Sequence, residues 1–568
     1  MKTRRGVLGD MVRLGVAAAL TPRAALAQSG QADLILFNGK VVPVDAQNTI
    51  SEAVAIQGGK VLKVGSNQEI QHLGGPLCRK IDLQGKMVTP GLIDSHYHLM
   101  YYGQQFWPGY LNIRIPEAQC KADVLRLVGE KAKQLAAGQW ISGNQGYHLR
   151  FGETLDRWDL DQVAPNNPVY LRQGSGQCAA VNSLALQIAG IDASTPNPTS
   201  SLILHDSQGE PTGILSHYPA EQLVAQHATG YGDRTEEQKL EDIDIAQDLC
   251  LQAGYTSVQD VIVGSWEDIE VYRKYANSGK LKVRLYLMLY INTQEQADKI
   301  VSKFQPIDSG RLKFGGWKLA LDGGCAVQTT LMYDKSLYAA GLSYPYHSQE
   351  ALNRLARTLH DTGLQVAVHV LGDQGIDMTL TAFEEAMKAS PRPDPRHRIE
   401  HGLFPTPEAL PRMKAGGIVL STQPHWIPWF GDSFLQTTNE QTMAHFLPLK
   451  TMLQMGVPLA FGCDVPSALF QEPKWAFSGA GLRRCENGTV LTPEERLSGP
   501  EMVRIHTMGS AYAGFSETTT GSLEPGKCAD LTIWSHDLFN LKANELNSLR
   551  AEMTIIDGEI VYDAGTLA

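Results

Sequence analysis

The sequence contains no run rich in lysine and arginine, and its 60 acidic residues outnumber its 49 basic ones, which gives a formal net charge of −11. A nucleic-acid-binding protein needs a basic face that displaces counterions from the phosphates. The charge balance therefore argues against a nucleic-acid partner and favours a small-molecule substrate.

Long apolar runs and paired cysteines are also missing. No segment beyond the N-terminus has the roughly eighteen uninterrupted apolar residues that a membrane-spanning helix needs. The eight cysteines are scattered without a C-x-x-C pair, and a chain of 568 residues buries a core large enough to fold without disulfides. We therefore expect no disulfide framework and no membrane contact apart from an export signal.

The N-terminus has the features of such a signal. Residues 1–27 combine the pair Arg4 and Arg5, a modest apolar stretch at 14–20 and an A-x-A cleavage site at 25–27. Twin arginines before a weakly hydrophobic core are typical of the twin-arginine export route. The alternative is a disordered basic N-terminus. The order of the three features predicts a periplasmic or secreted protein.

Short strand patterns with turn glycines occur near both ends of the mature chain. They lie at 33–42 and 53–65, and again at 529–535 and 553–563. Two β segments at opposite ends of a chain predict one small β-sandwich built from both termini. We assign residues 28–87 and 506–568 to this composite domain.

The middle of the chain, 88–505, alternates apolar, β-branched runs with helical stretches. Eight such runs are typical of a (β/α)8 TIM barrel, an α/β fold, whose active site lies at the carboxyl ends of its strands. A doubly wound open sheet is the alternative. The runs are 86–96, 256–263, 283–289, 314–321, 365–370, 398–401, 418–424 and 458–464.

One connection is much longer than the few residues usual between a strand and its helix. It separates the first run from the second and covers about 101–235. We expect this segment to form an inserted lobe over the mouth of the barrel.

The stretch "GLIDSHYHL" (91–99) places His96 and His98 two residues apart at the end of the first run. Side chains at i and i+2 of a strand point to the same face, so two imidazoles can converge on one ion. A pair of surface histidines is the alternative interpretation.

Other metal-ligand residue types follow later runs. His369, His401 and Asp464 end three of them, and Lys318 lies in a fourth. In a barrel these strand ends meet at one rim. Neutral imidazoles and a carboxylate suit zinc or a related divalent ion. Lys318 does not fit this set as it stands, because an ammonium group repels cations.

Six motifs stand in the order typical of one family: "TPGLIDSHYHL", "WKLALDGG", "VAVHVLGDQGID", "HRIEHG", "FGCDVPS" and "GSLEPGKCADLTIW". The chain resembles the amidohydrolase superfamily, specifically its amidohydrolase-3, or YtcJ-like, branch. The resemblance covers nearly the whole mature chain. Any single motif would be a weak signal, whereas the six together in this order are specific.

The resemblance implies one or two divalent metal ions, with zinc as the expected metal. It implies that Asp464 is both a metal ligand and the catalytic acid/base. It also implies that Lys318 can be carboxylated, and a negatively charged carbamate would remove the electrostatic objection to that residue. The implied metal ligands are His96, His98, Lys318, His369, His401 and Asp464.

The chain departs from the family pattern in segments expected to face the pocket. It has "DGGCAVQTT" at 322–330 where "DGSLGSRTA" is common, Gly176 and Gln177 where "GH" is common, and Cys463 where serine is usual. The ligand positions match the family pattern while these segments differ from it. We therefore expect this chain to share the family's reaction chemistry more closely than its substrates.

The expected reaction is hydrolysis of a C–N bond in an amide, N-acyl or cyclic amide substrate. Metal-activated hydroxide would attack the carbonyl, and Asp464 would carry the proton to the leaving nitrogen. A deaminase and an esterase or carbamate hydrolase remain alternatives on the same site. A non-catalytic, metal-stabilised binding or regulatory protein is a further alternative, although a structural zinc site has no need of Asp464.

Three residues are candidates for substrate contact: His148 in the lobe, Asp322 after the lysine run, and Trp426 after the seventh run. Each has an ordinary alternative, respectively a surface histidine, a helix cap and core packing. The sequence leaves open the substrate, the metal and its stoichiometry, and whether the chain forms a homo-oligomer.

Overall fold

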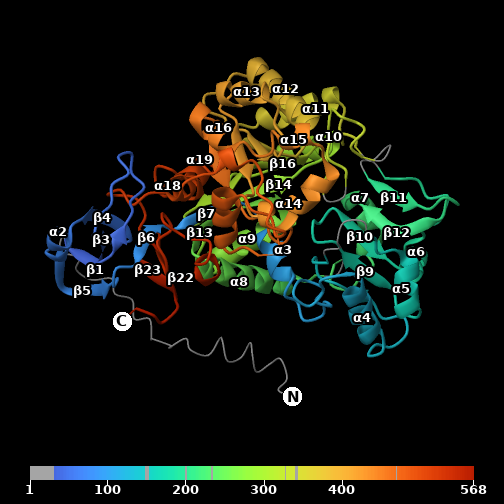
Figure 1. The fold of residues 1–568 in the computed structure, drawn as a ribbon, viewed down its shortest axis with the longest axis horizontal. Coiled ribbons are helices and arrows are strands. Elements are labelled where there is room, and N and C mark those ends of the chain that lie inside the picture. Colours follow the sequence, from blue (N-terminus) through green and yellow to red (C-terminus); the bar gives the residue numbers. More distant parts are fainter. Residues whose placement is uncertain are drawn as a thin grey trace.

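The computed structural model describes residues 31–147, 153–198, 201–231, 234–325, 328–338, 343–468 and 470–567. The expected export signal and His148 lie outside these ranges. The described chain has three parts: a central barrel, a pair of terminal sheets at one end of it, and a lobe at the other end (Figure 1).

Eight parallel strands form the barrel, and each pairs with the next around the sheet. The first and last come together where the Asp464 N–H donates to the His96 carbonyl at 2.8 Å. The predicted (β/α)8 barrel is thereby confirmed, and each predicted run overlaps one of its strands. They are β7 (Leu92–Tyr97), β13 (Tyr255–Val263), β14 (Arg284–Tyr290), β16 (Leu312–Ala320), β17 (Gln365–Val370), β18 (Arg398–His401), β19 (Val419–Thr422) and β20 (Leu459–Phe461).

Amphipathic helices surround the strands, which explains why the strands are apolar on both faces. In α11 the buried Leu352, Leu355 and Leu359 recur at helical spacing, and Ser348 caps the first turn by accepting from the Ala351 N–H at 3.2 Å. The helices around the barrel are α8 (Glu236–Gln252), α9 (Trp266–Asn277), α10 (Gln294–Val301), α11 (Gln349–His360), α12 (Asp373–Ala389), α13 (Ala409–Ala415), α14 (Trp426–Thr437), α15 (Glu440–Met443), α16 (Leu449–Met455), α17 (Lys474–Phe477), α18 (Gly499–Arg504) and α19 (Ser510–Ala513).

A polar layer lies inside the barrel around Arg398, whose side chain is fully buried. Its guanidinium donates to Gln259 Oε1 at 2.5 Å and to Ser421 Oγ at 3.0 Å, and it forms an ion pair with Glu400 Oε1 at 2.6 Å. These contacts connect three strands, β13, β18 and β19, so the barrel interior holds Glu400 in one position.

The terminal segments form two sheets in the orders β4-β3-β1-β5 and β2-β6-β21-β22-β23. They share a core that includes Leu36, Val54 and Ile533. Their strands are β1 (Ala32–Phe37), β2 (Lys40–Val41), β3 (Ala53–Gln57), β4 (Lys60–Gly65), β5 (Gly74–Asp82), β6 (Met87–Pro90), β21 (Leu531–Trp534), β22 (Ala551–Ile556) and β23 (Glu559–Asp563), with one short helix, α2 (Asn67–Gln71).

The run 86–96, which we predicted as one strand, supplies a strand to each of two sheets. β6 belongs to the terminal sheets and β7 to the barrel, with Gly91 between them. A Cβ on Gly91 would lie 2.1 Å from Thr256 Cγ2. Only glycine fits this close approach, so the chain changes sheet at this residue.

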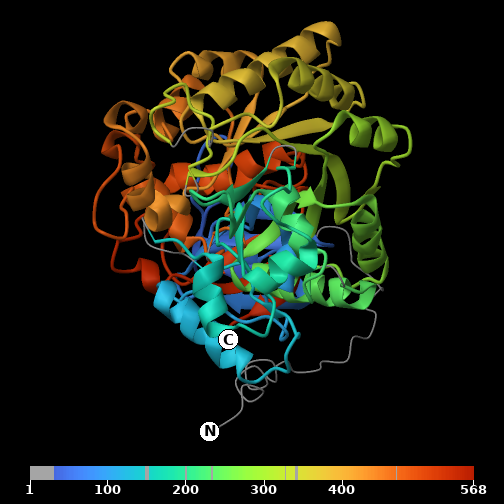
Figure 2. The same cartoon turned by 90° about the vertical axis from the view of Figure 1, so that its right-hand side faces the viewer.

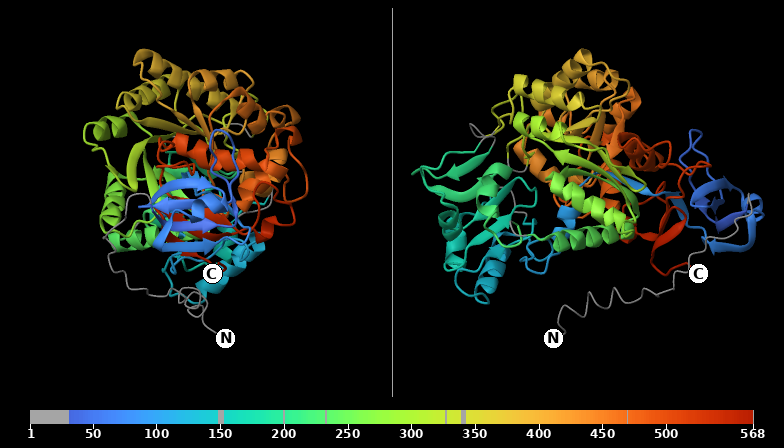
Figure 3. Two further views of the ribbon diagram at one scale, coloured as in Figure 1. Left: turned by 90° about the vertical axis from the view of Figure 1, so that its left-hand side faces the viewer. Right: turned by 180° about the vertical axis from the view of Figure 1, so that it is seen from behind.

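The inserted lobe has a five-stranded sheet in the order β11-β12-β10-β9-β8 and apolar cores of its own. Figure 2 looks onto the lobe and shows it in front of the barrel, while the views in Figure 3 place it at the opposite end from the terminal sheets. Its elements are β8 (Ile141–Ser142), β9 (Val169–Arg172), β10 (Cys178–Val181), β11 (Leu202–His205), β12 (Pro211–Ser216), α4 (Lys121–Ala132), α5 (Arg157–Val163), α6 (Ser183–Ala189) and α7 (Tyr218–Ala225), and α3 (Leu99–Gln104) leads into it.

All eight cysteines are free thiols in this structure. Among the described helices, none combines the length and apolar character that crossing a membrane would require.

Candidate metal centre and active site

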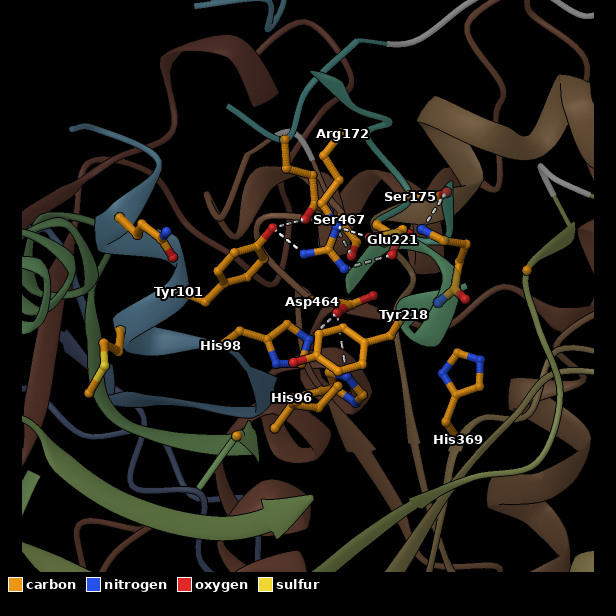
Figure 4. Close-up of a pocket in the computed structure, with 18 of the residues that line it drawn as sticks. His96, His98, Tyr101, Arg172, Ser175, Tyr218, Glu221, His369, Asp464 and Ser467 are labelled. Atoms are coloured by element: carbon orange, nitrogen blue, oxygen red, sulfur yellow. Dashed lines mark hydrogen bonds and ion pairs between the residues drawn. The ribbon is translucent and has the colours of Figure 1, made fainter. Parts of the chain in front are cut away.

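The carboxyl ends of the barrel strands open into a cavity of about 410 Å³. The structure brings together there five of the residues that the sequence nominated as metal ligands, and side chains of the lobe form the facing wall (Figure 4). The five are His96, His98, His369, His401 and Asp464.

The centre of the group is formed by His96, His401 and Asp464. One nitrogen or oxygen atom from each lies within 4.8 Å of the others. His96 Nε2 is 3.4 Å from Asp464 Oδ1, and the His401 ring centroid is 4.6 Å from that of His96 and 4.5 Å from that of His369. Side chains this close can serve as ligands of one ion.

His98 lies one residue beyond β7, yet its ring turns toward the same site. Its Nε2 is 2.8 Å from Asp464 Oδ1, and its ring centroid is 5.2 Å from that of His96. Its Nδ1 is buried and has no hydrogen-bond partner in the described structure.

Two of the candidate ligands have left-handed backbone conformations, with φ of 73° at His401 and 61° at Asp464. Such a conformation costs a non-glycine residue about 1–3 kcal/mol. It occurs at the last residue of β18 and three residues after the end of β20. After β18 a backbone hydrogen bond fixes the turn: the Gly402 N–H donates to the Val370 carbonyl at 2.9 Å. The strain turns both side chains into the cavity.

Outer partners orient two of the imidazoles. His96 Nδ1 is 2.5 Å from Glu400 Oε2, and His401 Nδ1 is 2.6 Å from Gln423 Oε1. With Nδ1 occupied, each ring presents Nε2 to the site, as metal-binding histidines usually do. Gln423 was not nominated from the sequence, although its place at the end of β19 follows the same strand-end rule.

Burial and neighbouring charges set the protonation of the site. Burial lowers the pKa of His369 to about 3 and that of His401 well below its usual range. Burial alone would raise the pKa of Asp464, but His96 and His98 outweigh it and hold that pKa below its ordinary value. The result is neutral imidazoles at His369 and His401 and an ionised carboxylate at Asp464, the protonation state that metal binding requires of these groups. At His96 burial alone would lower the pKa, but Asp464 and Glu400 outweigh it and raise that pKa above its ordinary value.

Lys318, in β16, is fully buried, and its Nζ has no hydrogen-bond partner in the described structure. Burial lowers its pKa to about 8, although Glu400 opposes the shift. A buried amine without a partner is costly unless a ligand or a modification compensates it.

The three substrate candidates have different surroundings. Asp322 is not among the residues that line the cavity. Its carboxylate accepts N–H donors at 3.0 Å from each of the two loops that flank it, and burial raises its pKa to about 7. Trp426 lines the cavity and stacks on His401, with centroids 4.9 Å apart and planes at 14°. His148 lies outside the described residues.

The sequence predicted a lobe over the barrel mouth but not the residues that form the lobe wall. This wall includes Tyr101 after β7, Arg172 at the end of β9, and Tyr218 and Glu221 on α7. No motif or spacing marks these residues, because their approach to the metal ligands depends on how the lobe sits on the barrel.

The residues present fit a divalent metal ion. His98 Nδ1, Lys318 Nζ and His369 Nε2 are buried without a hydrogen-bond partner among the described residues. Buried polar atoms without protein partners are rare, and several together indicate a missing ligand. Imidazole nitrogens with a carboxylate oxygen form a donor set suited to zinc.

Known proteins are similar to this chain over most of its length. A family profile described as "Amidohydrolase family" matches residues 79–562. The chain is 28% identical over 544 residues to N-substituted formamide deformylase of Arthrobacter pascens, which covers 94% of this chain and 98% of that protein. It is 29% identical over 540 residues to the putative amidohydrolase YtcJ of Bacillus subtilis (strain 168), covering 90% and 96%.

Solved structures with the same fold are similar over comparable lengths. An uncharacterized metal-dependent hydrolase from Pyrococcus horikoshii OT3 superposes with a TM-score of 0.70 at 24% identity, covering 90% of this chain and 98% of that one. A counterpart from Pyrococcus furiosus gives a TM-score of 0.68 at 25% identity, covering 89% and 100%.

Proposed function

The chain belongs to the amidohydrolase family, and from this premise we propose that it hydrolyses the C–N bond of an amide, N-acyl or cyclic amide substrate with the help of a bound metal. The convergence of His96, His401 and Asp464 within 4.8 Å at the cavity is the observation that carries the proposal. A purely structural metal site would be closed by its ligands and would not border a cavity of about 410 Å³.

One or two divalent ions, with zinc the first candidate, would be held by the four histidines and Asp464. When bound, such an ion lowers the pKa of a coordinated water and polarises a carbonyl group. We propose that Lys318 is carboxylated on Nζ, which would replace its positive charge with a negative one. The buried Nζ without a hydrogen-bond partner supports this assignment.

Asp464 is the acid/base residue in this proposal. Its carboxylate is ionised, is held by His98 at 2.8 Å, and borders the cavity. It would accept a proton from the attacking water and deliver it to the leaving nitrogen, because an amide nitrogen departs only once it is protonated. No serine or cysteine nucleophile is needed.

The purified protein, loaded with zinc, would be tested against N-formyl and N-acetyl amides, lactams and matched esters by measuring release of the amine or alcohol. The name of the Arthrobacter pascens relative makes N-substituted formamides the first compounds to try. We expect the amide substrates to be cleaved. Failure on every amide, or preferential cleavage of esters or deamination, would contradict the C–N proposal.

The proposed role of Asp464 is tested by Asp464→Asn, which should lower kcat by about 10²–10⁴, the usual contribution of a general acid/base. Its metal content should fall little. Asp268→Asn is the control, since Asp268 lines the same cavity but is paired with Lys239 at 2.7 Å. Near-normal turnover in Asp464→Asn would contradict the role.

We also propose that residues 1–27 direct export by the twin-arginine route to the periplasm or beyond. The order of Arg4 and Arg5, an apolar stretch and an A-x-A site supports this. The double variant Arg4→Lys with Arg5→Lys should accumulate in the cytoplasmic fraction. Unchanged export would contradict the proposal.

A further inference from the structure

We propose that Glu221 determines the substrate class of the cavity. By neutralising Arg172 it leaves the lobe wall without net charge, so the enzyme selects uncharged amides that carry an aromatic or apolar group over otherwise identical amides that carry a carboxylate. This inference rests on the proposed function and specifies which substrates the same site accepts.

The pair lies on the wall that faces the metal ligands. Arg172 Nε is 2.8 Å from Glu221 Oε2, and the Arg172 and Glu221 side chains are 15% and 2% exposed. The guanidinium also donates to the Gly176 carbonyl at 3.0 Å and to the Tyr101 hydroxyl. Figure 4 shows it between Tyr101 and Glu221 at the edge of the pocket.

An arginine in such a position would ordinarily bind a substrate carboxylate, because its planar fork matches carboxylate geometry. Here the Glu221 carboxylate is already paired with the Arg172 guanidinium. A substrate carboxylate would have to displace a buried protein carboxylate and leave that charge without a partner, which strongly disfavours binding. The site therefore loses affinity for an anionic substrate and keeps a polar but uncharged wall.

The other basic side chains of the cavity are compensated in the same way. Arg234 forms an ion pair with Asp242, and Lys239 forms one with Asp268 at 2.7 Å. All four residues line the same cavity. Among the described residues that line the cavity, each lysine or arginine is thus paired with a carboxylate that also lines it.

Apolar and aromatic side chains complete the lining. Tyr218 is three residues before Glu221 on α7, so both project from one face of the helix. Tyr218 is 54% exposed and Ile262 is 40% exposed, although both line the cavity. Large apolar side chains left in water beside a cavity mark a binding surface for an apolar group. Trp426 and Phe430 extend this surface.

The test uses two compounds that differ only by one carboxylate: N-formyl-2-phenylethylamine and N-formylphenylalanine. If another acyl group proves the better substrate, both compounds carry that group. We expect the zinc-loaded enzyme to show a kcat/KM at least about tenfold higher on the neutral compound. The free energy cost of leaving a buried charge unpaired is larger than the free energy difference that corresponds to a tenfold ratio. Equal or faster cleavage of the carboxylate compound would overturn the inference.

Glu221→Gln keeps the shape of the side chain and removes its charge, so Arg172 becomes an uncompensated cation. We expect the kcat/KM ratio to shift toward the carboxylate compound by at least about tenfold. Glu236→Gln is the matched control, because it frees Lys274, which is 58% exposed and is not among the residues that line the cavity, and the ratio should change less than about threefold. A folded Glu221→Gln protein with the wild-type ratio would overturn the inference.

Glu221→Gln leaves a charge buried and can impair folding. The double variant Arg172→Gln with Glu221→Gln removes both charges, and it should keep the preference for the neutral compound. A preference for the carboxylate compound in that variant would count against the inference.

Binding separates this inference from the proposed reaction. Calorimetry on zinc-loaded Asp464→Asn compares the two compounds without turnover, and tighter binding of the neutral one supports the inference even if neither is cleaved by the wild type. Absence of cleavage with selective binding would refute the C–N proposal alone. Equal binding of both compounds would refute the selectivity.

Discussion

The two rims of the barrel contain similar polar residues, but the rims differ in whether these residues have partners within the protein. At the amino-terminal rim, Arg284 Nε is 2.6 Å from Asp530 Oδ2, and Arg311 Nη2 is 2.8 Å from Asp557 Oδ2. These ion pairs join the barrel to the terminal sheets. At the carboxyl-terminal rim, the polar atoms Lys318 Nζ and His369 Nε2 are buried with no hydrogen-bond partner in the described structure.

The difference shows which end of the barrel is built for a ligand. Native proteins satisfy nearly all buried polar groups, so a cluster of unsatisfied ones at one rim marks a place where something else binds. The partners at the other rim come from the protein itself and contribute to stability only. Substitutions at the carboxyl-terminal rim should therefore change activity, whereas substitutions at the amino-terminal rim should change stability.

The largest effect is expected from two histidines at opposite ends of β18. His401→Ala removes a candidate ligand, and kcat/KM should fall at least about 100-fold, since even losing an outer partner of a metal ligand costs about 10–100-fold. Metal content, measured by elemental analysis, should fall with it.

His397, directly before β18, is the matched control. Its Nδ1 accepts from the Val366 N–H at 3.0 Å, and its Nε2 is 2.8 Å from His360 Nδ1. His397→Ala should keep the metal and lower the free energy of unfolding by about 1–3 kcal/mol, because it leaves buried polar groups unsatisfied. Full metal content in His401→Ala, or loss of metal in His397→Ala, would contradict the distinction between the rims.

A smaller effect is expected at Glu400, which connects His96 to Arg398. Glu400→Gln should weaken metal affinity about 10–100-fold, measured by competition with a chelator, because the His96 ring loses its anionic partner. Glu552 is also fully buried but lies in β22 of the terminal sheets. Glu552→Gln should leave metal affinity unchanged, and a similar loss in both variants would mean that Glu400 acts only through stability.

The smallest effect concerns the pH dependence of stability. Burial lowers the pKa of His397 well below the ordinary value of 6.5, and His360 and Arg392 act in the same direction. Below about pH 6.5 the unfolded chain therefore binds a proton that the folded chain does not. As the pH is lowered below about 6.5, this group should therefore reduce the free energy of unfolding by up to about 1.4 kcal/mol for each pH unit.

His397→Gln keeps an acceptor and a donor but does not titrate. Chemical denaturation between pH 7.5 and 5 should give a shallower pH dependence for this variant than for the wild type. If the free energy of unfolding depends on pH in the same way in both proteins, the claim that burial keeps His397 neutral in the folded state is contradicted.

The barrel and its ligand end followed from the sequence for a physical reason. Strands covered on both faces are continuous apolar runs, and the residues that end them must meet at one rim, so His369, His401 and Asp464 could be placed together. The division of 86–96 into two strands could not be seen, because both are buried and only Gly91 marks the change.

A lobe over the barrel mouth was expected from the long connection at about 101–235, but the charged side chains of its wall could not be predicted. Arg172 and Glu221 are separated along the chain and belong to a strand and a helix without a motif. Their pairing depends on how β9 and α7 pack within the lobe, and no local pattern in the sequence encodes those tertiary contacts. The substrate class was for this reason the part of the function least accessible from the sequence.

Anomalous X-ray diffraction from zinc-grown crystals of the purified protein tests the central claim most directly. One or two peaks should appear at the carboxyl-terminal rim, with His96, His401 and Asp464 among the nearest side chains. A fully active protein whose crystals show no peak there, or a peak only elsewhere, would contradict the assignment of this rim as the metal centre.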